Sequence, residues 1–357
     1  MTLTRRAALA GATALGGCAL LPKSKAREPR AMREPVIIAH RGASGERPEH
    51  TMMAYRLAIA QGADCIEPDL VPTKDGVLVC RHENDISGTT DIANHPEFAS
   101  RRTTKTVDGV VLTGWFTEDF TLAELKILRC RERLPQLRPA NTAYDGQEPI
   151  VTFGELLDLT IDESRRLGRV IGLYPEIKHA SYFDRLGLSH DKPLLDALRA
   201  RGLTTAEAPV FIQSFETDNL RRLANQTDVR RVQLVAPAGA PFNQPELTYA
   251  AMLTNTGLTR IQTYAQAISV EKSLLLPRDA AGRSTAPTDL IARAHEAGLK
   301  INAWTFRAEN TFLPLELRRG ADPAAHGDMV EELRTLFARG LDGAFCDFPA
   351  LGIAARG

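Results

Sequence analysis

The chain has 357 residues, enough to bury a large core, and its composition is typical of a soluble globular protein, with 43% hydrophobic and 25% charged residues. Forty-four Lys and Arg residues balance 44 Asp and Glu residues, so there is no net charge to attract nucleic acid or an anionic membrane. A nucleic-acid-binding role is therefore excluded, and any binding of an anion must depend on a few local groups.

The N-terminal segment differs from the rest of the chain. Arg5 and Arg6 precede residues 7–20, which carry no charge. This stretch is too short to span a membrane, and it fits the apolar region of an export signal. It contains Leu-Gly-Gly-Cys ending at Cys18, which resembles the lipobox of bacterial lipoproteins, while the arginine pair resembles a twin-arginine signal.

These features predict how the N-terminus is processed and where the protein resides. We expect residues 1–17 to be an export signal peptide of the lipoprotein or twin-arginine type. Residues 18–34 are rich in Lys and Arg and contain two prolines, as expected of a solvated tether. The protein is then periplasmic, and lipidation of Cys18 would tether it to a membrane.

From residue 35 to residue 357, short apolar runs alternate with helical patterns. The predicted strands are 36–40, 63–70, 77–82, 170–177, 210–213, 231–235, 259–265, 299–305 and 341–346. The predicted helices are 51–61, 152–168, 191–201, 216–225, 288–297 and 328–339. About eight β–α units favour a closed TIM (β/α)8 barrel over an open doubly wound sheet.

Two segments do not fit this alternation. Residues 83–150 contain Trp115, Phe116 and a helix opened by Thr121, and we expect them to form a small insertion subdomain over the barrel mouth. Residues 237–258 are a second irregular stretch.

Four cysteines follow the predicted signal peptide and tether. They are Cys65, Cys80, Cys130 and Cys346, and each has apolar neighbours typical of strands or helices. A core of this size needs no covalent cross-link, so we expect buried thiols and no disulfide.

Polar side chains gather where several predicted strands end. These side chains are His40, Arg41, Glu67, Asp69, His82, Glu176 and Lys178. Residues i and i+2 of a strand face the same side, so Glu67 points with Asp69, and Glu176 with Lys178. In a barrel such inward faces converge at the C-terminal rim, where active sites of this fold are built.

The residue types at this rim point to phosphoryl chemistry. Three carboxylates brought together would repel one another unless a cation lay among them. All-oxygen ligands favour Ca²⁺ or Mg²⁺ over zinc. With the cation, Arg41 and Lys178 would surround an anion such as phosphate, while His40 and His82 would supply a base and an acid near neutral pH.

The other histidines have simpler explanations. His50 lies at a predicted helix start, where capping explains it as well as catalysis does. We expect the remaining ones on the surface: His95, His179, His190, His295 and His326.

Several sequence blocks together resemble the glycerophosphodiester phosphodiesterase family, and in particular its bacterial periplasmic branch. The blocks run from residue 36 to residue 349 in the order typical of the family. They are His-Arg-Gly-Ala-Ser-Gly from His40, Pro-Glu-His-Thr from Pro48, Gln-Gly-Ala-Asp from Gln61, Glu-Pro-Asp-Leu from Glu67, Thr-Lys-Asp-Gly from Thr73, Tyr-Pro-Glu-Ile-Lys from Tyr174, Gln-Ser-Phe from Gln213 and Asp-Phe-Pro from Asp347.

The resemblance implies a barrel with an inserted subdomain and a metal-dependent hydrolysis of glycerophosphodiesters to sn-glycerol 3-phosphate and an alcohol. It implies the following roles: Ca²⁺ held by Glu67, Asp69 and Glu176, an acid–base pair of His40 and His82, and phosphate contacts from Arg41 and Lys178. Glu49 would support the metal or Arg41. Proline at position 68, between two of the ligands, departs from the family pattern and predicts a local irregularity in that strand.

The residues leave several alternatives open. Mg²⁺ is the second choice of ion, and either histidine could be the acid. The substrate could be an intact phospholipid or a lysophospholipid if Trp115 and Phe116 line an apolar groove at the mouth. A non-catalytic surface-binding lipoprotein is a further alternative, although no histidine or carboxylate of the set is missing. Nothing in the sequence selects the leaving alcohol or implies a protein partner.

Overall fold

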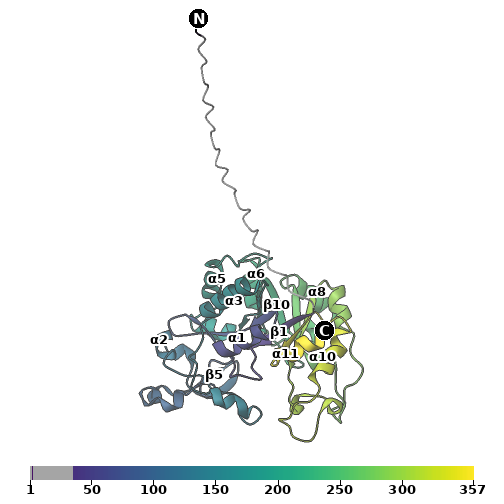
Figure 1. Cartoon of the computed structure of the whole chain (residues 1–357), viewed down its shortest axis with the longest axis horizontal. Helices are drawn as coiled ribbons and strands as arrows, with labels where there is room; N and C mark the ends of the chain where they lie inside the picture. The colour runs from purple at the N-terminus through teal and green to yellow at the C-terminus, as the bar shows by residue number, and fades with distance from the viewer. Residues whose placement is uncertain (1, 3–34) are drawn as a thin grey trace.

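A computed structural model describes residue 2 and residues 35–357 (Figure 1). Apart from residue 2, the predicted signal peptide and tether, with Cys18, lie outside the described residues. None of the helices in the described part is long and apolar enough to cross a membrane.

Strands and helices alternate along most of the described chain. The strands are β1 Val36–His40, β2 Cys65–Glu67, β3 Asp69–Pro72, β4 Leu78–Cys80, β5 Thr103–Val107, β6 Val110–Gly114, β7 Gly172–Leu173, β8 Glu176–Ile177, β9 Phe211–Ser214, β10 Arg230–Val235, β11 Ala267–Glu271, β12 Lys300–Phe306 and β13 Gly343–Cys346. The α-helices are α1 Met52–Ala60, α2 Leu122–Leu125, α3 Phe153–Leu167, α4 Ala180–Arg185, α5 Asp191–Arg199, α6 Thr217–Ala224, α7 Tyr249–Met252, α8 Asn255–Gln262, α9 Leu290–Glu296, α10 Met329–Phe337 and α11 Pro349–Arg356.

The parallel strands close into a barrel. Strands β2 and β3 are two parts of one barrel strand that is interrupted at Pro68. Strands β7 and β8 are likewise two parts of one barrel strand, interrupted at Tyr174 and Pro175. Their neighbours are β1 on one side and β9 on the other, and β10 to β13 continue the sheet in order until β13 pairs with β1. Counting each interrupted strand once gives eight, which confirms the predicted TIM barrel.

The interruptions follow from the two prolines. A proline has no N–H to donate to a neighbouring strand, so the ladder breaks at that residue. The irregularity that the sequence predicted at Pro68 is present, and the strand predicted over 170–177 is broken in the same way at Pro175.

Alternation along the strands separates the barrel interior from the surrounding shell. Val36 and Ile38 of β1 belong to the cluster inside the barrel, with Cys65 of β2. Ile37 and Ala39 point outward and pack under the helices. The same two-residue period brings His40 to the inner face at the C-terminal end of β1.

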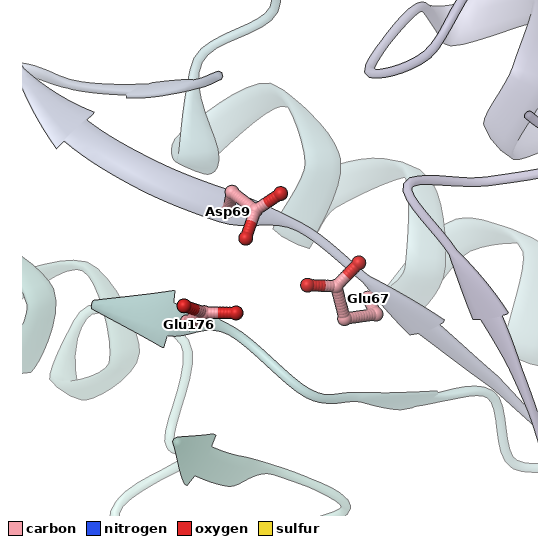
Figure 2. A group of neighbouring side chains, drawn as sticks. All are labelled: Glu67, Asp69 and Glu176. Atoms are coloured by element: carbon pink, nitrogen blue, oxygen red, sulfur yellow. The ribbon is translucent and has the colours of Figure 1, made fainter. Parts of the chain in front are cut away.

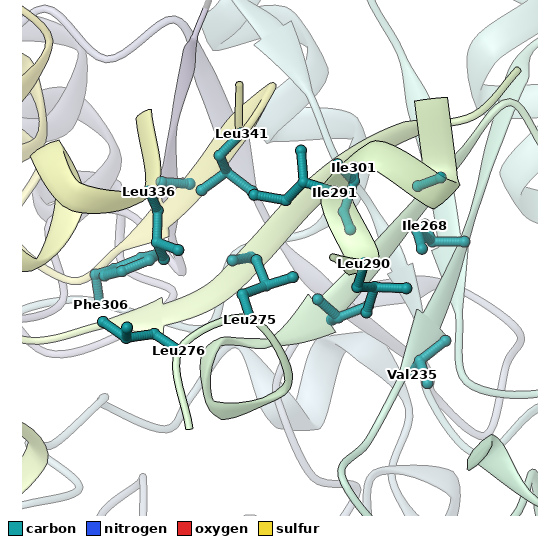
Figure 3. Close-up of a cluster of buried hydrophobic side chains, with 14 of the residues drawn as sticks. Val235, Ile268, Leu275, Leu276, Leu290, Ile291, Ile301, Phe306, Leu336 and Leu341 are labelled. Carbon is teal, nitrogen blue, oxygen red and sulfur yellow. The ribbon is translucent and has the colours of Figure 1, made fainter. Parts of the chain in front are cut away.

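Most of the hydrophobic core lies between the sheet and the helices. Figure 3 shows one such cluster, in which Leu290 and Ile291 of α9 and Leu336 of α10 lie among Ile268 of β11 and Ile301 of β12. All five side chains are buried. Each fully buried aliphatic side chain of this kind stabilises the fold by roughly 1.5–3 kcal/mol.

One predicted strand is wrong. The segment 259–265 belongs largely to α8, and the barrel strand is β11, which begins at Ala267. Leu258 and Ile261 are both buried at a spacing of three residues, which is the period of a helix and not of a strand. The Thr254 side chain caps this helix by accepting a hydrogen bond from the Gly257 amide. The stretch 237–258, predicted to be irregular, therefore includes α7 and the start of α8.

Residues 83–150 have a small core of their own. The antiparallel hairpin of β5 and β6 and the short helix α2 lie on one side of the barrel (Figure 1). Ile86, Phe98, Phe116, Phe120 and Leu128 pack together there. Trp115 donates a hydrogen bond from Nε1 to the Phe98 carbonyl and packs against the same core. Neither Trp115 nor Phe116 lines the cavity at the barrel mouth, so the two residues give no support for a phospholipid substrate there.

The cysteines of residues 35–357 lie in the core. Cys65, Cys80, Cys130 and Cys346 are buried thiols in the described part of the chain. Cys65 lies inside the barrel. Cys80 and Cys346 lie in the hydrophobic clusters between the sheet and the helices, and Cys130 lies in the cluster that includes the insertion.

His190 is buried, which contradicts its predicted surface position. It is 1% exposed, and its Nε2 donates a hydrogen bond to the Leu70 carbonyl at 3.0 Å. Burial lowers the pKa of His190 from 6.5 to about 4. Between these values the unfolded chain binds a proton that the folded chain does not bind, so the fold loses stability as pH falls from 6.5 to 4.

We expect His190→Gln to reduce this loss, because glutamine keeps a donor for Leu70 but does not titrate. The shift corresponds to about 3 kcal/mol over the window. Urea unfolding at pH 7.5 and pH 4.5 measures the loss in both proteins. The same pH dependence for the variant and the wild type would show that His190 is not responsible.

Candidate active site

Strand pairing places the predicted site residues side by side at the C-terminal end of the barrel. His40 on β1 is the register partner of Glu67 on β2. Asp69 on β3 pairs with Glu176 on β8, which in turn pairs with Gln213 on β9. Because these strands are parallel neighbours, side chains far apart in sequence lie next to one another at this end of the barrel.

Glu67, Asp69 and Glu176 form one acidic cluster. Figure 2 shows their three carboxylates turned toward one another, and one oxygen from each lies within 4.8 Å of the others. All three residues are buried, and Asp69 Oδ1 accepts no hydrogen bond although it is shielded from solvent. A buried carboxylate oxygen without a donor fits a ligand to a hard cation, as does the all-oxygen character of the set.

The charges in this cluster favour cation binding. Burial and the Asp69 charge raise the pKa of Glu67 well above its usual value, and burial raises the pKa of Glu176 to about 7. Burial would also raise the pKa of Asp69, but the Arg41 guanidinium, the Lys178 ammonium and the hydrogen bond from His50 together outweigh it and hold that pKa well below its usual value. A divalent cation would relieve the repulsion that protonates the two glutamates.

Arg41 is held rigidly at the base of the site. Its guanidinium lies 2.9 Å from Glu49 Oε2 and 3.1 Å from Asp69 Oδ2, as the sequence predicted for Glu49 in its supporting role. Its backbone has a φ of 59°, and the turn continues through Gly42 at 86°. A Cβ at Gly42 would lie 2.8 Å from the Ala54 carbonyl carbon, so only glycine fits there.

Lys178 supplies the second cation. Its Nζ donates to Glu176 Oε1 at 2.9 Å and lies 4.0 Å from Asp69 Oδ1. The same nitrogen lies 3.3 Å from His82 Nε2. Burial lowers the pKa of Lys178, but the carboxylates of Glu176, Asp69 and Glu83 together outweigh burial and raise it overall, so the ammonium stays charged.

His40 is oriented by a buried network of charges. Its Nδ1 donates to Asp347 Oδ1 at 2.6 Å, which leaves Nε2 without a hydrogen-bond partner. Asp347 Oδ2 in turn accepts from Arg138 at 2.5 Å and from Arg307 at 3.0 Å. Arg138 comes from the insertion and also binds Glu309 at 2.6 Å. Burial and the Arg41 charge lower the pKa of His40 to about 4, so the ring is neutral at pH 7.

His82 lies opposite, in a chain of acid–base pairs. Its Nδ1 is 2.8 Å from Glu83 Oε1, and Glu83 Oε2 is 3.1 Å from His179 Nε2. His179 also donates from Nδ1 to Asp108 Oδ2 at 2.6 Å. Desolvation and the Arg41 charge lower the pKa of His82 to about 3. His179, predicted on the surface, is therefore part of the support for His82, and its side chain is only 14% exposed.

His50 is not a helix cap. Thr51 occupies the N-cap position of α1, and His50 is fully buried behind the acidic cluster. Its Nε2 donates to Asp69 Oδ2 at 2.9 Å, and Tyr55 lies 2.8 Å from its Nδ1. His50 thus fixes one oxygen of Asp69 and leaves the other for a ligand.

A cavity of about 340 Å³ opens above these groups. Of the seven predicted site residues, all except Asp69 line it, and Asp69 lies directly beneath at 1% exposure. Its other walls include Gln213, Phe215, Leu234, Trp304 and two further cations, Arg133 and Arg307. The cavity therefore combines two neutral histidines and four cations with the acidic cluster, around a space large enough for a small ligand.

Sequence reasoning missed the groups that orient the histidines. Asp347 was noted only as part of a family block, although its position directly after the last strand places it on the same rim as the other site residues. Glu83 follows His82 immediately. Arg138 and Arg307 carry no local signal, because each acts through a contact with a residue distant in sequence.

Comparison with known proteins gives a consistent answer. Residues 40–351 match the model of the glycerophosphoryl diester phosphodiesterase family. Two solved structures share the fold: a phosphodiesterase from Oleispira antarctica in complex with the product sn-glycerol 3-phosphate, and a glycerophosphodiester phosphodiesterase from Agrobacterium tumefaciens. The Oleispira structure matches with a TM-score of 0.59 at 20% identity and covers 90% of this chain and 97% of its own. The Agrobacterium structure matches with a TM-score of 0.56 at 18% identity and covers 89% of this chain and 99% of its own.

Relatives with more similar sequences have the same name. A glycerophosphodiester phosphodiesterase from Arabidopsis thaliana is 36% identical over 338 residues, covering 91% of this chain and 87% of the relative. One from Haemophilus influenzae is 26% identical, and the match covers 97% of this chain and 96% of the relative. With a family match over most of its length and a relative of this identity, the chain belongs to the glycerophosphoryl diester phosphodiesterase family.

Proposed function

We propose that this protein hydrolyses glycerophosphodiesters to sn-glycerol 3-phosphate and an alcohol, with Ca²⁺ as the cofactor and Mg²⁺ as the second choice. The observation that carries the proposal is the convergence of three buried carboxylates, two cations and two carboxylate-oriented histidines on one cavity. A surface-binding lipoprotein would have no need of this arrangement.

Glu67, Asp69 and Glu176 would hold the divalent cation, which when bound neutralises negative charge on the phosphate oxygens. Arg41 and Lys178 lie at the edge of the same cluster and would contact the phosphate from the side. Their pairing with carboxylates keeps both of them in place before the substrate arrives.

His40 and His82 would transfer the protons. Each ring has Nδ1 next to a carboxylate, which directs the proton to that nitrogen and leaves Nε2 as the atom that exchanges protons at the cavity. One ring takes the proton of the glycerol 2-hydroxyl as its oxygen bonds to phosphorus, and the other gives a proton to the alcohol oxygen as its bond to phosphorus breaks. Water then adds to the resulting cyclic phosphate and breaks its bond to the glycerol 2-oxygen, which leaves glycerol 3-phosphate. A bound phosphate raises the pKa of the ring that must act as the acid, because its negative charge stabilises the imidazolium.

The products identify the bond that is broken. Incubation of the protein with glycerophosphocholine should release glycerol 3-phosphate and choline, both of which ³¹P NMR and a choline oxidase assay can detect. Phosphocholine and glycerol as products would place the broken bond on the other side of phosphorus and overturn the proposal.

A phospholipid-acting phosphodiesterase is the second candidate, because Val110 and Val111 at the tip of the β5–β6 hairpin are 57% and 68% exposed. We nevertheless expect glycerophosphocholine to be turned over at least tenfold faster than lysophosphatidylcholine, since the central cavity holds only about 340 Å³ and many charged side chains line it. Comparing kcat/KM for both compounds below the critical micelle concentration tests this expectation. Faster turnover of the lysophospholipid would reverse the substrate assignment.

We also propose export to the periplasm and anchoring through a lipidated Cys18. The support comes from the charged and apolar pattern of the first residues and from the Leu-Gly-Gly-Cys sequence. Metabolic labelling with palmitate, followed by fractionation, compares the wild type with Cys18→Ala. Absence of label from the wild type would remove the anchor.

A further inference from the structure

Two further cavities adjoin the central one and have opposite charge. The first, which we call the acidic arm, has a volume of about 500 Å³ and shares His82 and Arg133 with the central cavity. The second, the basic arm, has a volume of about 630 Å³ and shares Trp304, Thr305 and Arg307. A phosphodiester has two substituents, and a group attached to phosphorus at the central cavity can extend into either arm.

The acidic arm lies between the barrel and the insertion. Its charged lining comprises the carboxylates of Glu49, Glu83, Asp85 and Asp108 and the cations Arg133 and His179. Although burial lowers the pKa of His179, its bonds to Asp108 and Glu83 raise it to about 9, so this ring is charged at pH 7. Four carboxylates against two cations leave the arm with a net negative charge.

Glu49 shows that the acidic arm retains an acceptor for a ligand. Glu49 is 5% exposed, and only its Oε2 is used, by Arg41 at 2.9 Å and by Arg133 at 2.8 Å. Neither arginine bonds Oε1, and the residue lines the acidic arm but not the central cavity, so this second oxygen is left for a donor or a cation in the arm.

The remaining walls of the acidic arm are apolar. Val107, Val110 and Leu112 of the β5–β6 hairpin line it. A small cation with a methylated or methylene surface matches such a lining, because the walls take up the apolar part while the carboxylates face the charge.

The basic arm would reject the same group. Lys272, Arg278 and Arg307 line it against a single carboxylate, Glu271. Opposite charges in the two arms therefore orient a zwitterionic diester, with its phosphate at the central cavity and its ammonium directed away from the basic arm.

We propose that the acidic arm binds the alcohol part of the substrate and selects alcohols that carry an ammonium group, as choline and ethanolamine do. This rests on the proposed hydrolysis of glycerophosphodiesters and adds the preferred leaving group to it. Asp85 is then a specificity-determining residue, since its carboxylate accepts hydrogen bonds from Ser87 and contacts neither the acidic cluster nor the two catalytic histidines in the described structure.

The test compares two substrates of the same shape and different charge. These are glycerophosphocholine and the analogue in which 3,3-dimethylbutanol replaces choline, so that a carbon atom stands in place of the quaternary nitrogen. For the wild type we expect kcat/KM to be about tenfold higher with glycerophosphocholine, because only that ester gains from the negative lining. Glycerophosphoglycerol, with a neutral alcohol, should resemble the isostere.

Substitution of Asp85 locates the effect. Asp85→Asn should lower the ratio of the two kcat/KM values, and should do so by lowering the value for glycerophosphocholine while changing the isostere little. Glu271→Gln in the basic arm is the matched control, because it removes one carboxylate from the other cavity and should leave the ratio unchanged.

The outcomes separate this inference from the proposed function. If neither ester releases glycerol 3-phosphate, the proposed function fails. If both esters are hydrolysed with equal kcat/KM by the wild type, or if the ratio responds to Glu271→Gln and not to Asp85→Asn, the reaction stands and the acidic arm is not the ammonium site.

Discussion

Replacing His40 by alanine is expected to lower kcat for glycerophosphocholine by roughly 10²–10⁴-fold, the range over which a positioned acid or base acts. The ring lines the central cavity, its Nδ1 is held by Asp347, and its Nε2 has no other hydrogen-bond partner. No other side chain offers a neutral nitrogen at that point. Steady-state kinetics with saturating metal ion measures the loss.

Two controls distinguish chemistry from folding. His95→Ala removes a histidine of the insertion that is not part of the site and should retain full activity. The far-ultraviolet circular dichroism spectrum and the Tm of His40→Ala should resemble those of the wild type. A folded His40→Ala protein with wild-type turnover would contradict the role of His40.

Replacing Arg138 by leucine is the second large effect that we expect. Arg138 is 6% exposed and binds Glu309 and Asp347, which are themselves buried. Asp347 keeps Arg307 and His40 as partners, but Glu309 is left as a buried carboxylate without a cation. Removing one partner of a buried ion pair typically costs about 3–5 kcal/mol, which urea unfolding measures.

Activity should fall together with stability in this variant, because Asp347 orients the His40 ring. The double variant Arg138→Leu/Glu309→Leu separates the two effects. Removing both charges should restore much of the unfolding free energy, since no unpaired carboxylate remains. If Arg138→Leu unfolds at the same urea concentration as the wild type, the buried network does not hold the insertion to the barrel.

The barrel was predictable from the sequence because its signals are local. Buried runs such as Val36–His40 end in polar side chains, and a capping box at Thr152 opens α3 as expected. The error at 259–265 arose where threonines interrupt the apolar pattern, so that a helix with buried residues three apart was mistaken for a strand. Side-chain burial, which sequence does not display, decides between the two periods.

The seven predicted site residues converge for the same local reasons. Each lies in a barrel strand or within two residues of the end of a strand, on the part of the sheet that faces one rim of the barrel. The histidines are oriented by Asp347, Glu83 and Arg138. The sequence shows these residue types but not which of them contact one another in the fold. His179 was assigned to the surface because its partners, Glu83 and Asp108, are far from it along the chain.

The most direct test of the account is the metal dependence of the reaction. Protein beginning after Cys18 is stripped of metal with a chelator, dialysed and given glycerophosphocholine, and glycerol 3-phosphate release is followed with and without added Ca²⁺ or Mg²⁺. We expect release only after an ion is added, with Ca²⁺ more effective than Mg²⁺, because the three carboxylates need a cation to be charged together. Release at the full rate from metal-free protein, or no release with either ion from a folded sample, would contradict the proposed function.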